Sequence, residues 1–249
     1  MDRAWQLQTE IQEAYELYQF QTIYQKVVNF CSLDLGGFYL DIVKDRQYTA
    51  KHDCLARRSA QTAMFHVIEA MVRWLAPITS FTAEEIWQAL PGQRSESVFL
   101  ETWYQQLFPL ELDAEINTNT WESIMAARAS VSKELEQWRS KGAIGSSLNA
   151  EIELYCDQTF HYELGKLADE LHFVFITSKC SLHAIQDSPA DSVATEWDGL
   201  KLRVVVSEQP KCVRCWHQRA DVGKHPLHPE LCGRCLENVQ GDGETRRYA

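Results

Sequence analysis

The sequence predicts a mainly α-helical protein, followed by a small α+β segment and a short cysteine-rich tail. Three observations support this order. Apolar residues recur with helical spacing through about the first 141 residues. Polar and apolar residues alternate in parts of residues 142–207, as they do in half-buried strands. Four of the eight cysteines lie in residues 208–249. We therefore expect three consecutive domains: residues 1–141, 142–207 and 208–249.

The helical part is expected to contain about five helices. Apolar stripes predict helices over residues 2–31, 55–75, 82–90 and 121–138. The pair Gly36-Gly37 is expected to interrupt the helical pattern before an apolar run leads into a polar string. Thr82 and Glu85 have the spacing of a capping box, which places a helix start at Thr82. Together these helices predict a bundle.

The middle of the chain has a different pattern. Strands are predicted over residues 151–156, 173–176 and 200–206, with a helix over residues 160–171. Polar and small residues at 187–192 predict a surface loop. This combination is typical of a small α+β domain.

Composition and charge limit the classes of protein to consider. The chain has 249 residues, of which 45% are hydrophobic, and eight tryptophans argue for a packed core. No apolar run reaches the roughly 18 residues of a membrane span, and the first ten residues are too polar for a signal peptide. We expect a soluble cytoplasmic protein with no membrane partner.

The net charge of −11 argues at first against a nucleic-acid partner. The charge is uneven, however. Residues 151–200 contain 2 basic and 10 acidic side chains, whereas residues 201–249 contain 9 basic and 6 acidic ones. A phosphate backbone can therefore meet the ends of this chain while avoiding its third quarter.

The strongest motif is a pair of CxxC sequences, Cys212–Cys215 and Cys232–Cys235. Four thiolates satisfy tetrahedral Zn²⁺ and leave no open position for a substrate water, so the predicted ion is one structural zinc. Its binding would fold a tail that has almost no apolar core of its own. A pair of redox CxxC motifs is the less favoured interpretation. Three histidines in the same segment are alternative ligands: His217, His225 and His228.

A zinc deaminase is a rival interpretation. It would use His161 and Glu163 with the first CxxC pair, but Pro210 lies one residue too early for that signature and the second pair would have no role. The sequence motifs of nucleotide-binding loops, serine hydrolases and zinc proteases are missing from the sequence. No catalytic residue is predicted.

Basic side chains surround the cysteines, and they accompany an aromatic residue, Trp216. Such a group can hold phosphates and stack an unpaired base. Trp216 can equally pack over the cysteine turn without any ligand. The sequence leaves these two roles open.

Several segments together resemble one family. They are residues 44–49 (KDRQYT), 72–87, 145–148 (GSSL), 241–247 (GDGETRR) and both CxxC pairs with their flanks. They are similar to the C-terminal part of bacterial isoleucyl-tRNA synthetases, within the class I aminoacyl-tRNA synthetases. The resemblance covers essentially the whole chain. It implies an anticodon-binding helical bundle, a small α+β junction domain and a C-terminal four-cysteine zinc finger.

The same resemblance implies that the chain binds the anticodon stem-loop of isoleucine tRNA. Aminoacylation and ATP binding would belong to a catalytic domain with HIGH and KMSKS motifs, which do not occur here. The segment alone is thus expected to be inactive. The catalytic part of the synthetase is a further expected partner, and DNA is not. The alternative is a zinc-ribbon adaptor protein without tRNA specificity.

Nine residues are candidates for tRNA contact, because cations neutralise phosphates and an aromatic ring stacks on bases. They are Lys44, Arg46, Arg57, Arg58, Lys133, Lys141, Arg214, Trp216 and Arg234. The ordinary alternatives are a solvated helix face for the arginine pair, and pairing of the two helix lysines with Glu134 or Glu136.

Overall fold

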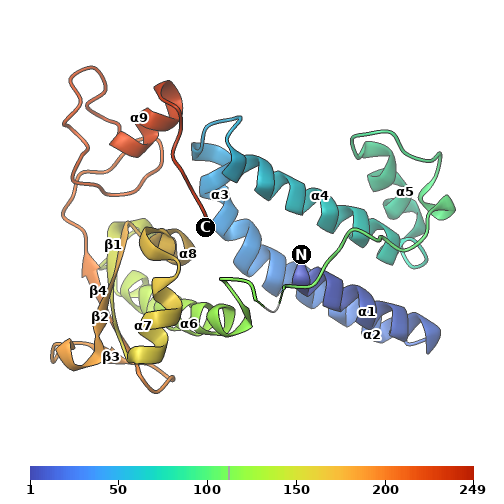
Figure 1. Ribbon diagram of the computed structural model, residues 1–249, viewed down its shortest axis with the longest axis horizontal. Coiled ribbons are helices and arrows are strands. Elements are labelled where there is room, and N and C mark those ends of the chain that lie inside the picture. Colours follow the sequence, from blue (N-terminus) through green and yellow to red (C-terminus); the bar gives the residue numbers. More distant parts are fainter. Residues whose placement is uncertain (112) are drawn as a thin grey trace. The chain divides into compact units, whose positions relative to one another are not determined.

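The computed structural model describes residues 1–111 and 113–249, which pack as two compact units (Figure 1). The helical unit consists of residues 1–41 and 58–111. The mixed unit consists of residues 42–57 and 113–249. These units cut the chain at other places than residues 141 and 207, so the expected division into three domains stays a prediction.

The helical unit is built from α1 (Asp2–Glu16), α2 (Phe20–Asn29), most of α4 (Leu55–Leu75), α5 (Ser80–Ala89) and a 3₁₀ turn (Val98–Leu100). One of its largest buried side chains is Trp74, which is fully enclosed and meets Phe30 edge-on. The indole Nε1 of Trp74 donates to Gln8 Oε1 at 2.9 Å, and Gln8 Nε2 donates to the Tyr104 carbonyl at 2.8 Å. The buried polar atoms of Trp74 and Gln8 thereby have hydrogen-bond partners.

Two expectations for this region are wrong. The helical backbone is not interrupted at Gly36-Gly37, because a π-helical segment (Phe30–Tyr39) carries it directly into α3 (Leu40–Thr49). In this wider helix a Cβ on Gly36 would lie 3.1 Å from the Cys31 carbonyl oxygen, which explains why glycine fits there. Helix α5 begins at Ser80 and not at Thr82, since the Ala83 amide already donates to the Thr79 carbonyl.

The mixed unit contains a sheet whose described strands have the order β2-β1-β4-β3. These are β1 (Ala150–Cys156), β2 (Lys179–Ala184), β3 (Val193–Ala194) and β4 (Leu200–Val206). Strand β1 runs parallel to β2 and antiparallel to β4. A parallel pair needs a crossover, and α7 (Gln158–Gly165) and α8 (Leu171–Phe175) supply it.

One face of the sheet is buried under helices. Ile152 and Leu154 of β1 and Leu202 of β4 share an apolar cluster with α7, α8 and α6 (Thr118–Ser140), which lie beside the strands in Figure 1. Helix α6 therefore packs with the sheet, although its sequence pattern placed it among the helices of the bundle. Its apolar stripe shows that one face is buried but does not reveal the partner.

The strand expected over residues 173–176 is instead the end of α8. Phe173, Val174 and Phe175 are all buried, so this short run has no polar face from which a period could be read. Ile176 adopts a left-handed conformation (φ 56°) and ends the helix. The next strand, β2, was not anticipated from the sequence.

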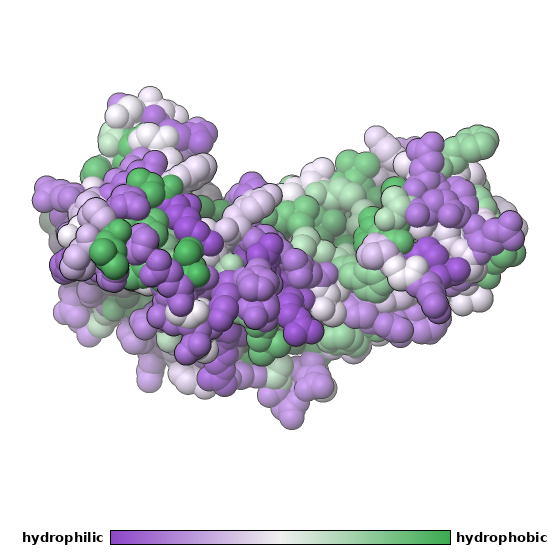
Figure 2. Space-filling view, turned by 90° about the horizontal axis from the view of Figure 1, so that it is seen from above, coloured by the Kyte–Doolittle hydropathy of each residue, from purple (hydrophilic) through white to green (hydrophobic). Residues whose placement is uncertain are grey.

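Polar and apolar residues are mixed on the surface. Figure 2 shows hydrophilic residues over most of the viewed face, with apolar residues among them. Among the residues described, no helix combines the length and the apolar character needed to span a bilayer.

Candidate metal centre and nucleic-acid interface

The two CxxC pairs converge on one point. The Sγ atoms of Cys212, Cys215, Cys232 and Cys235 all lie within 4.8 Å of one another, and all four side chains are buried. Zinc bound by four thiolates has Zn–S distances of about 2.3 Å, so sulfurs at this separation could surround a tetrahedral ion. The four cysteines lie together as their spacing predicts, and their role as ligands of one zinc ion stays a prediction.

Local backbone geometry aims the sulfurs inward. In the first pair the Trp216 amide donates to the Cys212 carbonyl, and the Cys212 amide donates to the His217 carbonyl, both at 2.9 Å. This tight turn places Trp216 in the left-handed region, at φ 66°. In the second pair Cys232 is the N-cap of α9 (Gly233–Gln240), so Cys235 lies in the first turn of that helix. The positive end of a helix favours a thiolate there.

The donor set fits a zinc ion. The Cys232 amide lies 3.4 Å from Cys212 Sγ, and Arg214 Nη1 lies 3.7 Å from Cys235 Sγ. Donors and cations around four sulfurs offset the negative charge that a Zn(Cys)₄ centre carries.

The rival deaminase arrangement is not formed. In the described ranges the potential metal-binding cluster consists of the four cysteines, and His161 is not part of it. The Glu163 carboxylate is held instead by Lys166 Nζ (2.6 Å) and the Thr120 hydroxyl (2.5 Å), which lower its pKa. The alternative ligands His217, His225 and His228 also lie outside the cluster.

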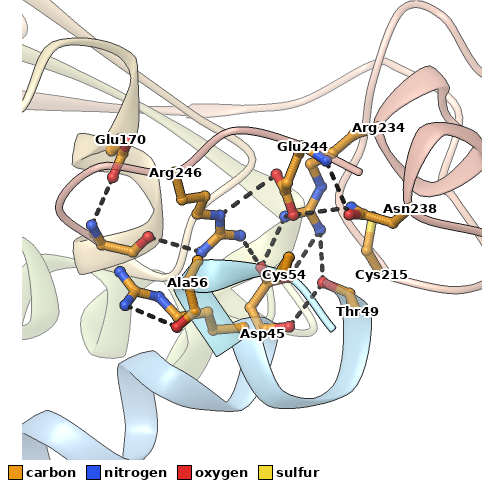
Figure 3. Close-up of polar contacts among 12 residues, drawn as sticks. Asp45, Thr49, Cys54, Ala56, Glu170, Cys215, Arg234, Asn238, Glu244 and Arg246 are labelled. Carbon is orange, nitrogen blue, oxygen red and sulfur yellow. Dashed lines mark hydrogen bonds and ion pairs between the residues drawn. The ribbon is translucent and has the colours of Figure 1, made fainter. Parts of the chain in front are cut away.

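An ion-pair network lies beside the cysteines and joins them to α3 (Figure 3). Arg234, between Cys232 and Cys235, makes a two-pronged contact with the Asp45 carboxylate at 2.7 and 2.8 Å. Arg246 also pairs with Asp45, and Glu244 approaches Arg234 at 3.5 Å. The Arg246 and Arg234 side chains are only 1% and 7% exposed. Buried charges of this kind are tolerated when each is paired.

The candidate tRNA contacts are divided between the two units. Five of them are exposed: Lys44, Arg58, Lys133, Lys141 and Trp216. Lys133 pairs with Glu196, 63 residues away along the chain, and not with a glutamate of its own helix. Arg46 and Arg57 are half-buried, and both belong to the mixed unit, whereas Arg58 belongs to the helical unit.

The three candidates beside the cysteines differ from one another. Trp216 is 60% exposed, and Lys211 Nζ lies 5.5 Å from its ring centre, so this ring is available for stacking. Arg214 donates to the Thr49 carbonyl at 2.6 Å, and Arg234 is enclosed by its carboxylate partners. Sequence reasoning missed the partners of these arginines. Asp45, the acidic residue of the KDRQYT motif, is the sequence feature that could have indicated a partner for an arginine.

Comparison with known proteins agrees with this geometry. A family model described as the anticodon-binding domain of tRNA ligase matches residues 1–154, and a model of the zinc finger found in FPG and IleRS matches residues 209–238. Isoleucine–tRNA ligases of Alkalilimnicola ehrlichii, Methylococcus capsulatus and Pseudomonas aeruginosa are 55%, 56% and 55% identical over the whole chain. The chain spans only 26–27% of the length of these relatives. It belongs to the family of anticodon-binding domains of tRNA ligases.

Proposed function

We propose that this chain is the C-terminal, tRNA-binding part of an isoleucine–tRNA ligase and that it binds the anticodon stem-loop of isoleucine tRNA. The observation that carries the proposal is identity of about 55% along the entire chain, with the anticodon-binding model over its first 154 residues. ATP-dependent aminoacylation then belongs to the remaining three-quarters of the ligase, which is the proposed partner in the cytoplasm. The adaptor alternative is not favoured by these matches.

In the proposed binding mode, charged side chains position the tRNA backbone and other side chains contact its bases. Exposed cations such as Lys44, Arg58 and Lys141 would neutralise phosphates, and splayed anticodon bases would be read by stacking and by hydrogen bonds to their edges. Zinc, held by the four cysteines, supplies no chemistry to the substrate and fixes the fold of residues 208–249, which we propose as the finger domain.

Trp216 offers a test that separates binding from folding. Because Trp216 has φ 66°, glycine suits its backbone better than any bulky residue does. Trp216→Gly should therefore keep zinc bound while it removes the ring. We expect tRNA affinity to fall by about 5- to 150-fold, which corresponds to the 1–3 kcal/mol of one base–aromatic stack. The measurement is a fluorescence titration at one fixed salt concentration, with zinc content determined in parallel.

The control for this experiment is Trp197→Gly. Trp197 is also half-exposed but lies in the loop before β4, within the acidic third quarter of the chain. We expect it to leave tRNA affinity unchanged. Equal affinities of the wild type and Trp216→Gly would show that this ring does not stack on tRNA.

A further inference from the structure

Three side chains next to the zinc ligands reach one short piece of α3 and its C-terminal flank, residues 45–51, here called the coupling segment. They are Arg214, which precedes Cys215, Arg234, which precedes Cys235, and Asn238, one turn further along α9. Neighbouring Cα atoms are fixed 3.8 Å apart, so the positions of the two arginines follow those of the ligands. Geometry at the metal is thereby transmitted to these side chains.

The contacts occupy groups that a helix end leaves without partners. Helix α3 ends at Thr49. Arg214 Nη1 donates to the Thr49 carbonyl at 2.6 Å, and Nη2 lies 3.4 Å from the Tyr48 carbonyl. The last carbonyls of a helix have no partner within the helix. A cation at this end also interacts favourably with the negative end of the helix dipole. Asn238 Oδ1 accepts from the Lys51 amide at 3.1 Å, two residues beyond the helix end. The finger therefore caps α3.

Asp45 is the common partner in this arrangement. Its carboxylate faces both Arg234 and Arg246, as Figure 3 shows. Burial alone would raise the pKa of Asp45, but the hydrogen bond and charge of Arg234, with the charge of Arg246, outweigh burial and hold the pKa well below its usual range. Removal of the carboxylate would leave two buried guanidinium groups with less compensating charge, and an uncompensated buried charge is strongly destabilising.

We propose that Asp45 is a positioning residue that couples the zinc centre to the coupling segment, so that metal binding and the order of residues 45–51 support each other. The coupling acts in both directions, as linkage requires. Zinc that fixes Arg214 and Arg234 holds α3 in place. An intact Asp45 in turn holds Arg234 and slows the opening of the cysteine turn beside it.

The consequence for nucleic acid rests on the proposed function. Of the candidates for phosphate contact, Arg46 lies within the coupling segment and Lys44 directly precedes it. A zinc centre that orders residues 45–51 would fix the spacing of these cations without touching tRNA itself. Zinc would then contribute to tRNA affinity through α3 as well as through the finger.

The first test is the rate at which a chromogenic chelator removes zinc from the full chain. Asp45→Asn should release zinc about 10- to 100-fold faster than the wild type, in proportion to the 10- to 100-fold loss of metal affinity that follows when groups around metal ligands are removed. Asp45→Glu, which keeps the charge, should restore most of the slow release. Asp53→Asn is the matched control, because Asp53 is exposed two residues beyond the coupling segment and lies 4.0 Å from His52. If Asp45→Asn releases zinc at the rate of Asp53→Asn, the proposal is wrong.

A second test uses a milder variant, in case Asp45→Asn does not fold. Thr49→Val is milder, since it removes the hydroxyl that lies 3.3 Å from Arg234 Nη2. Hydrogen exchange of wild type and Thr49→Val is followed with zinc bound and with zinc removed. Zinc removal should speed amide exchange in residues 45–51 at least tenfold and leave β1 and β4 unchanged, and Thr49→Val should show part of this effect with zinc bound. Unchanged exchange in residues 45–51 after zinc removal would overturn the proposal.

Neither test uses tRNA, so the two proposals fail separately. Faster zinc release from Asp45→Asn in a chain that does not bind tRNA would support the coupling and refute the proposed function. Normal tRNA binding by the wild type, with zinc release from Asp45→Asn unchanged, would refute the coupling alone.

Discussion

Replacing Cys232 with serine is expected to weaken zinc binding by more than about 100-fold. Removing a group that only hydrogen-bonds to a metal ligand already lowers metal affinity about 10- to 100-fold, and this substitution removes a ligand itself. Cys232 is fully buried, and it is also the N-cap residue of α9. Residues 212–240 have few apolar contacts besides the cysteines, with Val222 and Leu231 packed against them. Without metal this region should therefore unfold. Zinc content and chelator titration measure the first effect, and hydrogen exchange of α9 measures the second.

The matched control is Cys31→Ser. Cys31 lies in the helical unit, half-buried against its core, and no described metal cluster includes it. We expect this variant to bind zinc as the wild type does. The helical unit should keep its circular dichroism in Cys232→Ser, since its apolar core is built from other residues. Full zinc occupancy in Cys232→Ser, or loss of the whole helical signal, would contradict this account.

Trp74→Ala should destabilise the helical unit by about 3–5 kcal/mol, as large aromatic deletions do in packed cores. Trp74 is fully buried, and its indole nitrogen is the donor to Gln8 Oε1. The variant leaves both a cavity and an unsatisfied buried amide oxygen, and the two costs add. The shift is measured by urea unfolding followed by circular dichroism, with zinc content unchanged.

Trp5→Ala is the control for this second prediction. Trp5 lies on α1 of the same unit, but its side chain is 39% exposed. Its removal should cost about 1–2 kcal/mol, less than the loss for Trp74→Ala, since a partly exposed ring transfers less apolar surface from water. Similar losses in Trp5→Ala and Trp74→Ala would show that Trp74 is not central to this core.

The four-cysteine cluster could be predicted from sequence because the cysteines of each pair lie only three positions apart. The spacing of each CxxC pair already brings two sulfurs together, and the chemistry of zinc supplies the reason for the other two. Long helices such as α4 and α6 were also predictable, since an apolar stripe over 20 residues is a strong signal.

Other features depend on tertiary partners and carry no such local signal. Residues 173–175 of the run at 173–176 are all buried, so neither a helix nor a strand period is visible in it. The pairing of Asp45 with Arg234 joins residues 189 positions apart. Arg234 therefore looked like a surface cation from the sequence, whereas the structure shows it buried beside the cysteines. A single sequence does not reveal which distant carboxylate compensates a given arginine.

The proposed recognition of isoleucine tRNA is tested most directly by comparing the affinities of the chain for two tRNAs. The full zinc-bound chain is titrated with isoleucine tRNA and with a tRNA of unrelated anticodon, both at the same moderate salt concentration, because affinities for nucleic acid depend steeply on salt. We expect isoleucine tRNA to bind at least tenfold more tightly. Equal affinities for the two tRNAs would contradict recognition of the anticodon by this chain.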